Sequence, residues 1–270
     1  MRPPSLVTAC ADRPDVRSAF GARLSDGPAP ADALHLSKPD AAPLRDWLAA
    51  EQAEVSGADR KLAAAFLLGR LSWSLVECAG FLALRGYASG SLPTTGVAVS
   101  RREERWSFGE RSGRASAYDL HLSGGAAIPS PDPAADLERT LTTWLAPLVT
   151  TLTDRSGLSR GALWRLVGDA LSACLLAQGR VLGCPERAMR IALGPLRDPS
   201  SPLHAPQNGF VRVTLPEDPT VSDWAAKRGG CCRYYTAGAE TCATCVLRDD
   251  DSREALLRED LRRRHGRAAA

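Results

Sequence analysis

The chain has 270 residues, of which 44% are apolar and 24% are charged, the usual balance of a protein that buries a hydrophobic core. Its 34 basic and 31 acidic residues are mostly interspersed and give a formal net charge of only +3. This balance argues against a nucleic-acid partner and favours a mixed, solvated surface. A chain of this length can form one large domain, or a main domain with a small appendix.

Neither a cleaved secretory signal nor a transmembrane segment is expected. Charged residues such as Asp12 and Arg13 appear before any apolar run can develop at the N-terminus. The most apolar stretch, residues 62–84, contains Arg70 and Glu77, and each charge would be costly at the centre of a bilayer. We therefore expect a buried helix there, and a cytoplasmic protein.

The first third of the chain predicts a lead-in followed by two helices. Residues 1–40 are rich in Pro, Ala and Asp, with a Gly-Pro-Ala-Pro breaker at 27–30, which indicates a loosely structured segment with at most a short helix. Helical patterns then cover about 43–54 and 59–85. Asp59 is the expected N-cap of the second helix.

The segment from 86 to about 133 has a different character, because Gly, Ser and Pro become frequent and apolar residues alternate with polar ones. This alternation predicts two or three antiparallel strands. The charged run Arg-Arg-Glu-Glu-Arg at 101–105 indicates a hairpin or a solvent-facing strand end.

Helices return in the second half of the chain. Apolar spacing predicts helices at about 136–154 and 158–178, with Gly179 ending the second, and a short helix near 185–193. Residues 210–213 are typical of a short strand. A capping-box pattern at 251–254 opens a charged helix that reaches about residue 264.

Four of the eight cysteines lie together near the C-terminus. Cys231, Cys232, Cys242 and Cys245 form the pattern C-C-x9-C-x2-C. In a reducing cytosol, clustered cysteines are more often metal ligands or redox groups than disulfides.

The other four cysteines are scattered and are given no part in a site. Cys78 and Cys174 lie within apolar helical patterns, where a free cysteine packs as a small hydrophobic residue. Cys10 and Cys184 fall in predicted loops.

Several interpretations of the four clustered cysteines compete. Four thiolates are the ordinary ligand set of a [2Fe–2S] cluster, and they also suit tetrahedral zinc. Zinc sites usually pair two short Cys-x-x-Cys knuckles, whereas the side chains of adjacent cysteines diverge, and a cluster that divides its ligands between two irons relaxes that demand. We therefore favour iron–sulfur over zinc. A disulfide between adjacent residues would be strained, and four unliganded thiols is the remaining alternative.

The neighbouring residues suit a sulfur-rich site. Gly229 and Gly230 permit close backbone approach, so that their N–H groups can point at sulfur. Arg233 brings positive charge, and Tyr234 and Tyr235 can shield the site from water, although a turn, a surface charge and core aromatics are the plain alternatives.

Adjacent cysteines followed by Cys-x-x-Cys near the end of a helical chain resemble the FhuF-like ferric-siderophore reductases. That family carries a C-C-x10-C-x2-C motif for a [2Fe–2S] cluster, with an aromatic residue after the pair. The matching residues here are Cys231, Cys232, Cys242 and Cys245, with a middle spacing one residue shorter. Residues 144–148 and 158–166 resemble further family segments.

The resemblance implies one-electron reduction of a ferric siderophore, with release of Fe(II) in the cytoplasm. No catalytic residue beyond the cluster is expected, because one-electron transfer needs no general acid, base or nucleophile. The sequence has no G-x-G-x-x-G pattern, so electrons would come from an external donor such as a ferredoxin or a flavin reductase. The alternatives are a structural zinc-binding module and an iron–sulfur sensor without reductase activity.

The expected fold class is α+β, with a mainly helical body, a small antiparallel sheet and a C-terminal four-cysteine iron–sulfur segment. The expected division is a lead-in at 1–40, a reductase-like domain at 41–220, and a cluster segment with its helix at 221–270. Two basic surfaces are candidate docking sites or simply solvated: residues 101–114 for the chelate, and the arginine run at 262–267 for an acidic ferredoxin.

Overall fold

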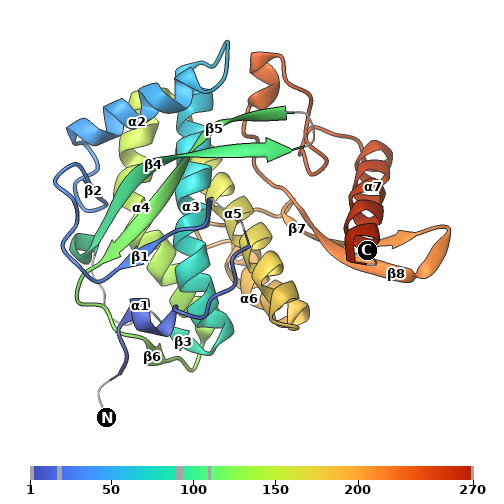
Figure 1. Ribbon diagram of the computed structural model, residues 1–270, viewed down its shortest axis with the longest axis horizontal. Helices are drawn as coiled ribbons and strands as arrows, with labels where there is room; N and C mark the ends of the chain where they lie inside the picture. The colour runs from blue at the N-terminus through green and yellow to red at the C-terminus, as the bar shows by residue number, and fades with distance from the viewer. Residues whose placement is uncertain (1–2, 17–19, 89–93, 109–110, 269–270) are drawn as a thin grey trace.

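The computed structural model describes residues 3–16, 20–88, 94–108 and 111–268. Its body is a bundle of helices around a long central helix, α3, and an antiparallel hairpin lies across one face of that bundle (Figure 1). The expected α+β class is confirmed. The helices of the body are α1 (Leu6–Ala9), α2 (Ala42–Ala53), α3 (Arg60–Leu84), α4 (Pro133–Ser156), α5 (Arg160–Val181) and α6 (Pro185–Arg197).

The central helix is a core element. Asp59 caps it as predicted, since its side chain accepts a hydrogen bond from the Leu62 N–H at 2.7 Å. By length and composition α3 is able to cross a membrane, but 78% of its most apolar window is buried inside the protein. Its two charges have partners: Arg70 pairs with Glu51 at 2.6 Å, and Glu77 accepts from the indole of Trp73.

The sheet is built on the hairpin of β4 (Val97–Phe108) and β5 (Arg111–Leu122), which confirms the predicted antiparallel strands. Two short strands extend it, in the order β1-β5-β4-β2. The charged run 101–105 lies in the middle of β4, not at the hairpin turn, because ion pairs such as that of Arg102 with Asp119 at 2.9 Å satisfy its charges. The short strands are β1 (Leu24–Ser25), β2 (Leu34–His35), and the separate pair β3 (Tyr87–Ala88) and β6 (Ile128–Pro129).

The N-terminal segment differs from the loosely structured lead-in that its composition predicts. Leu6, Leu34 and Leu36 are buried in the main core, and β1 and β2 pair with the hairpin. Cys10, expected in a loop without a role, is fully buried with its sulfur 3.4 Å from that of Cys78. A strand of two residues is too short to show a periodic pattern, so the sequence does not predict it.

The C-terminal unit has a small core of its own. It comprises β7 (Gly209–Leu215), β8 (Asp218–Lys227) and α7 (Asp250–Ala268), and Figure 1 shows α7 lying on the β7–β8 ribbon at one side of the body. The helix starts earlier than predicted, because Asp249 caps it through the N–H of Ser252 at 2.8 Å. This core is formed by Val213, Leu215, Ala225, Leu257 and Leu261.

The helix α5 runs three residues beyond its predicted end at 178. Gly179 stays within it, and a β-carbon there would lie 2.6 Å from the side chain of Ala188. The left-handed turn that the sequence pattern placed at Gly179 is made instead by Gly183, with a φ of 68°. The glycine at 179 therefore serves the packing of α6 against α5.

Candidate metal centre

The four clustered cysteines lie on the connection between β8 and α7, which passes over the helical body. This connection, residues 228–249, contains one turn of 3-10 helix, η3 (Tyr234–Ala237). Its sulfur-bearing residues differ in exposure: Cys231 and Cys232 are half-buried, Cys242 is exposed and Cys245 is buried. A site made from them would thus have one side embedded and one side open to the surface.

A buried carboxylate on α5 holds the start of this connection. Asp169 Oδ1 accepts hydrogen bonds from the Gly229 N–H at 2.8 Å and the Asn208 side chain at 2.9 Å. Its Oδ2 accepts from Arg228 Nε at 2.8 Å, and the Gly230 N–H reaches both oxygens at 3.2 Å. Sequence reasoning missed Asp169, although an acidic residue inside an otherwise apolar helical face is a signal of a buried polar role.

Burial raises the pKa of Asp169, and the ion pair with Arg228 together with the two glycine N–H groups acts in the opposite direction. The pKa of Arg228 is raised: burial alone would lower it, but the Asp169 carboxylate and the sulfurs of Cys232 and Cys242 outweigh that effect. The guanidinium thus faces the Asp169 carboxylate and the cysteine sulfurs together, with Nη1 4.0 Å from Cys242 Sγ.

The two glycines before the cysteine pair are packed so closely that a side chain would force their neighbours to shift. A β-carbon on Gly230 would lie 3.0 Å from Asp169 Oδ2 and 3.1 Å from the backbone of Arg165 and Leu166. One on Gly229 would lie 3.1 Å from Asn208. Close backbone approach is therefore confirmed. The expectation that the glycine N–H groups point at sulfur is wrong, because both donate to Asp169.

A different backbone N–H serves the first cysteine. The pKa of the Cys231 thiol is raised, chiefly by burial and also by negative charge on Cys232 and Cys245. The N–H of Arg233 donates to its sulfur and acts in the opposite direction. Arg233 adopts the left-handed conformation, with a φ of 65°, and its guanidinium lies 3.5 Å from Asp59 at the start of α3. The turn after the cysteine pair is thus anchored to the helical body as well.

The two tyrosines lie at the surface of the protein. Tyr234 is 40% exposed and Tyr235 is 45% exposed, so the alternative of core aromatics is wrong. The ring of Tyr234 instead packs on Phe66 of α3, with 5.4 Å between ring centroids.

The chemistry of the donor set fits a thiolate-bound group. Four cysteines, an N–H directed at one sulfur and a guanidinium beside another are the donors and compensating charge that such a group requires. Within the described ranges, no three His, Cys, Asp or Glu side chains gather about one point as ligands of a single ion would. Either group, a tetrahedral zinc or a two-iron cluster, would need the four sulfurs drawn closer together around it.

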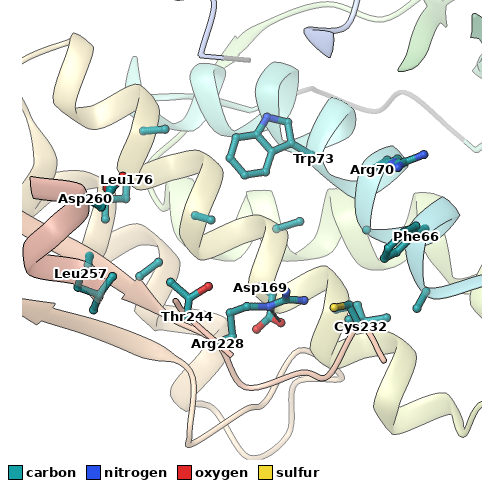
Figure 2. Close-up of a pocket in the computed structure, with 18 of the residues that line it drawn as sticks. Phe66, Arg70, Trp73, Asp169, Leu176, Arg228, Cys232, Thr244, Leu257 and Asp260 are labelled. Carbon is teal, nitrogen blue, oxygen red and sulfur yellow. Dashed lines mark hydrogen bonds and ion pairs between the residues drawn. The ribbon is translucent and has the colours of Figure 1, made fainter. Parts of the chain in front are cut away.

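A cavity of about 510 Å³ opens beside the cysteine connection. It lies between α3 and α5 on one side and β8 and α7 on the other (Figure 2). Cys232 and Phe66 stand at one end, Leu176 and Leu257 at the other, and Trp73 faces the Arg228–Asp169 pair across it. One of the four candidate ligands therefore forms part of a pocket wall.

The two basic surfaces singled out in the sequence form internal ion pairs. Arg102 pairs with Asp119 and Glu104, and Arg114 pairs with Glu103 across the hairpin. In the terminal run, Arg262 pairs with Glu217 and Arg264 with Asp223 and Asp260. The side chains of Phe108, Arg111 and Arg267 lie outside the described residues.

No protein-family model matches the chain, and a search of curated proteins finds no match. The resemblance to the FhuF-like reductases therefore rests on the motif residues themselves.

Proposed function

We propose that this chain is a ferric-siderophore reductase that holds a [2Fe–2S] cluster on Cys231, Cys232, Cys242 and Cys245. The observation that carries the proposal is the placement of these residues. The Asp169 carboxylate fixes the connection that bears them to the helical body, with one cysteine exposed and another in the wall of a cavity. A fixed site that faces the surface at Cys242 and the cavity at Cys232 suits transfer of an electron from a partner to a bound chelate.

One electron is what a bound [2Fe–2S] cluster supplies, and one electron converts ferric to ferrous iron. Siderophores bind through hard oxygen donors that match Fe(III), so reduction weakens the chelate and lets the metal leave. The protein's own residues hold the ligands in place, compensate their negative charge and exclude part of the solvent. Arg228 supplies that compensating charge beside Cys232 and Cys242.

The electron donor would be a separate protein, such as a ferredoxin or a flavin reductase, in the cytoplasm. The exposed Cys242 marks the side of the site that such a donor can approach, since transfer between proteins requires a redox group close to the surface. The half-buried Cys232 faces the cavity on another side.

The test is anaerobic purification followed by a metal assay, a visible spectrum and electron paramagnetic resonance of the dithionite-reduced protein. We expect two irons per chain, a brown colour and the spin-half signal of a reduced binuclear cluster, which then re-oxidises when a ferric siderophore is added. Cys245→Ser should lose the iron, whereas Cys184→Ser, a half-buried cysteine outside the motif, should keep it.

The opposite results separate the alternatives. One zinc per chain and no colour would replace the reductase with a structural zinc module. A cluster that forms but leaves every tested ferric siderophore unreduced would point to an iron–sulfur sensor.

A further inference from the structure

The cavity beside Cys232 has the character of a small-molecule site. At about 510 Å³ it falls in the range of ligand pockets, which are mostly apolar with a few placed polar groups. Much of its wall is small or aromatic, and three alanines on α5 leave space beside the larger side chains of that helix. The residues that form this apolar wall include Phe66, Gly69, Trp73, Ala170, Ala173 and Ala177.

The charges of the cavity are matched within the protein. Every arginine that lines it, in the part of the chain described, already has a carboxylate partner. A highly anionic ligand would therefore have to compete with those carboxylates, and a ligand of low net charge would not. The pairs are Arg70 with Glu51 and Glu54, Arg180 with Asp223, Arg228 with Asp169, and Arg264 with Asp223 and Asp260.

The cavity also joins the candidate metal centre directly. Cys232 and Thr244, one on each half of the cysteine connection, are both part of its lining. Figure 2 shows the sulfur of Cys232 at the end of the cavity marked by Phe66. A small molecule bound there would lie directly against the sulfur of Cys232, with no protein layer between the molecule and the cluster that this sulfur would bind.

The geometry points to this cavity as the docking site of the ferric chelate: its apolar arms enter between α3, α5 and α7, and its metal centre lies beside Cys232. The inference rests on the proposed reductase function and adds the place of binding and the kind of chelate, one with apolar arms and low net charge. The cavity takes the place of the basic hairpin segment 101–114 as the candidate docking surface, because Arg102 and Arg114 of that segment already pair with carboxylates of the sheet.

Binding can be measured apart from reduction. The probe is the gallium(III) complex of a linear trihydroxamate that ends in an ammonium group. Three hydroxamate anions neutralise the metal, so the complex carries a single positive charge, and Ga(III) is not reduced. It is titrated into the full chain with its oxidised cluster. We expect Ala173→Trp, which fills the cavity from α5, to weaken binding at least tenfold, and Ala177→Leu to weaken it severalfold. Ala162→Leu, a half-buried alanine on the same helix but outside the cavity, is the matched control.

Iron content and circular dichroism check that each variant is folded and holds its cluster. If Ala173→Trp does not fold, the affinity of Ala177→Leu alone tests the docking site. Unchanged affinity in a folded Ala177→Leu and Ala173→Trp, or no binding to the wild-type chain, would overturn the docking site. A gallium tris-catecholate, triply negative, should bind at least tenfold more weakly, and equal or tighter binding would overturn the charge argument. Failure of the reductase proposal would show separately, as a cluster that no ferric chelate re-oxidises.

Discussion

The carboxylate of Asp169 accepts a hydrogen bond from the Gly229 N–H at 2.8 Å, although 60 residues separate the two in the chain. This bond ties the middle of α5 to the segment that leads into Cys231 and Cys232. Because Asp169 is buried and its other oxygen accepts from Arg228, a single side chain fixes both the path of the backbone and the cation nearest the sulfurs. The rigidity of the candidate centre therefore depends on a residue that would bind no metal.

Asp169→Asn should loosen the cysteine connection. The new amide would place its NH₂ group against one of the groups that now donate to Asp169. Arg228 or a glycine N–H would then be left buried without an acceptor. We expect the free energy of unfolding to fall by about 2–4 kcal/mol. We also expect a chelator to remove bound iron several times faster.

Urea unfolding followed by circular dichroism measures the first effect, and bleaching of the visible spectrum measures the second. Asp154→Asn, on the exposed end of α4, is the control and should change neither. Iron that is held as firmly in Asp169→Asn as in the wild type would show that Asp169 does not support the centre.

Gly230→Ala should be destabilising for a steric reason alone. The new β-carbon would lie 3.1 Å from backbone atoms of Arg165 and Leu166, which a rigid helix cannot move. We expect a loss of about 1–3 kcal/mol in thermal or urea unfolding. Gly161→Ala, where nothing lies within 4 Å, should instead gain up to about 1 kcal/mol from helix propensity. A neutral Gly230→Ala would mean that the connection is not seated on α5 in solution.

Much of the fold follows from local patterns. The long helices and the hairpin are identified by the spacing of their apolar residues, and α3 also by its cap at Asp59. The four cysteines are identified by their spacing alone. The strand β8 and the contacts of Asp169 were not predicted, because β8 has few buried side chains and the partners of Asp169 lie 39 to 61 residues away. The pairings of short edge strands and the cavity arise only from tertiary packing, which no local window contains.

Leu261→Ala should unfold the C-terminal unit locally before the body. Leu261 is buried in a core of only five residues, which is separate from the main core. Removing a buried leucine costs about 2–5 kcal/mol, and so small a core cannot redistribute the loss. Hydrogen exchange should quicken in β7, β8 and α7 and stay slow in α3 and α5.

Leu148→Ala, at a fully buried position of α4, is the matched control and should lower the stability of the whole body. Equal protection of all elements in Leu261→Ala would mean that the C-terminal unit and the body unfold as one.

Glu51 should make stability depend on pH. Its carboxyl is fully buried, accepts from the Tyr118 hydroxyl at 2.6 Å and pairs with Arg70. Burial raises the pKa of Glu51 above its usual value near 4.5, against the opposing effect of Arg70. The folded state therefore binds more protons than the unfolded state between the usual and the raised pKa. The free energy of unfolding then falls as pH rises through that window, and levels off above it.

Glu51→Gln removes this titration. Across the window, the stability of the wild type relative to Glu51→Gln should decrease with rising pH, by about 1.4 kcal/mol for each unit by which folding raises the pKa. Urea unfolding from pH 4 to pH 8 measures the difference, and Glu186→Gln, at an exposed position on α6, is the control and should track the wild type. A difference that is constant with pH, or that grows in favour of the wild type as pH rises, would contradict a raised pKa, and would mean that Arg70 outweighs burial at this carboxyl.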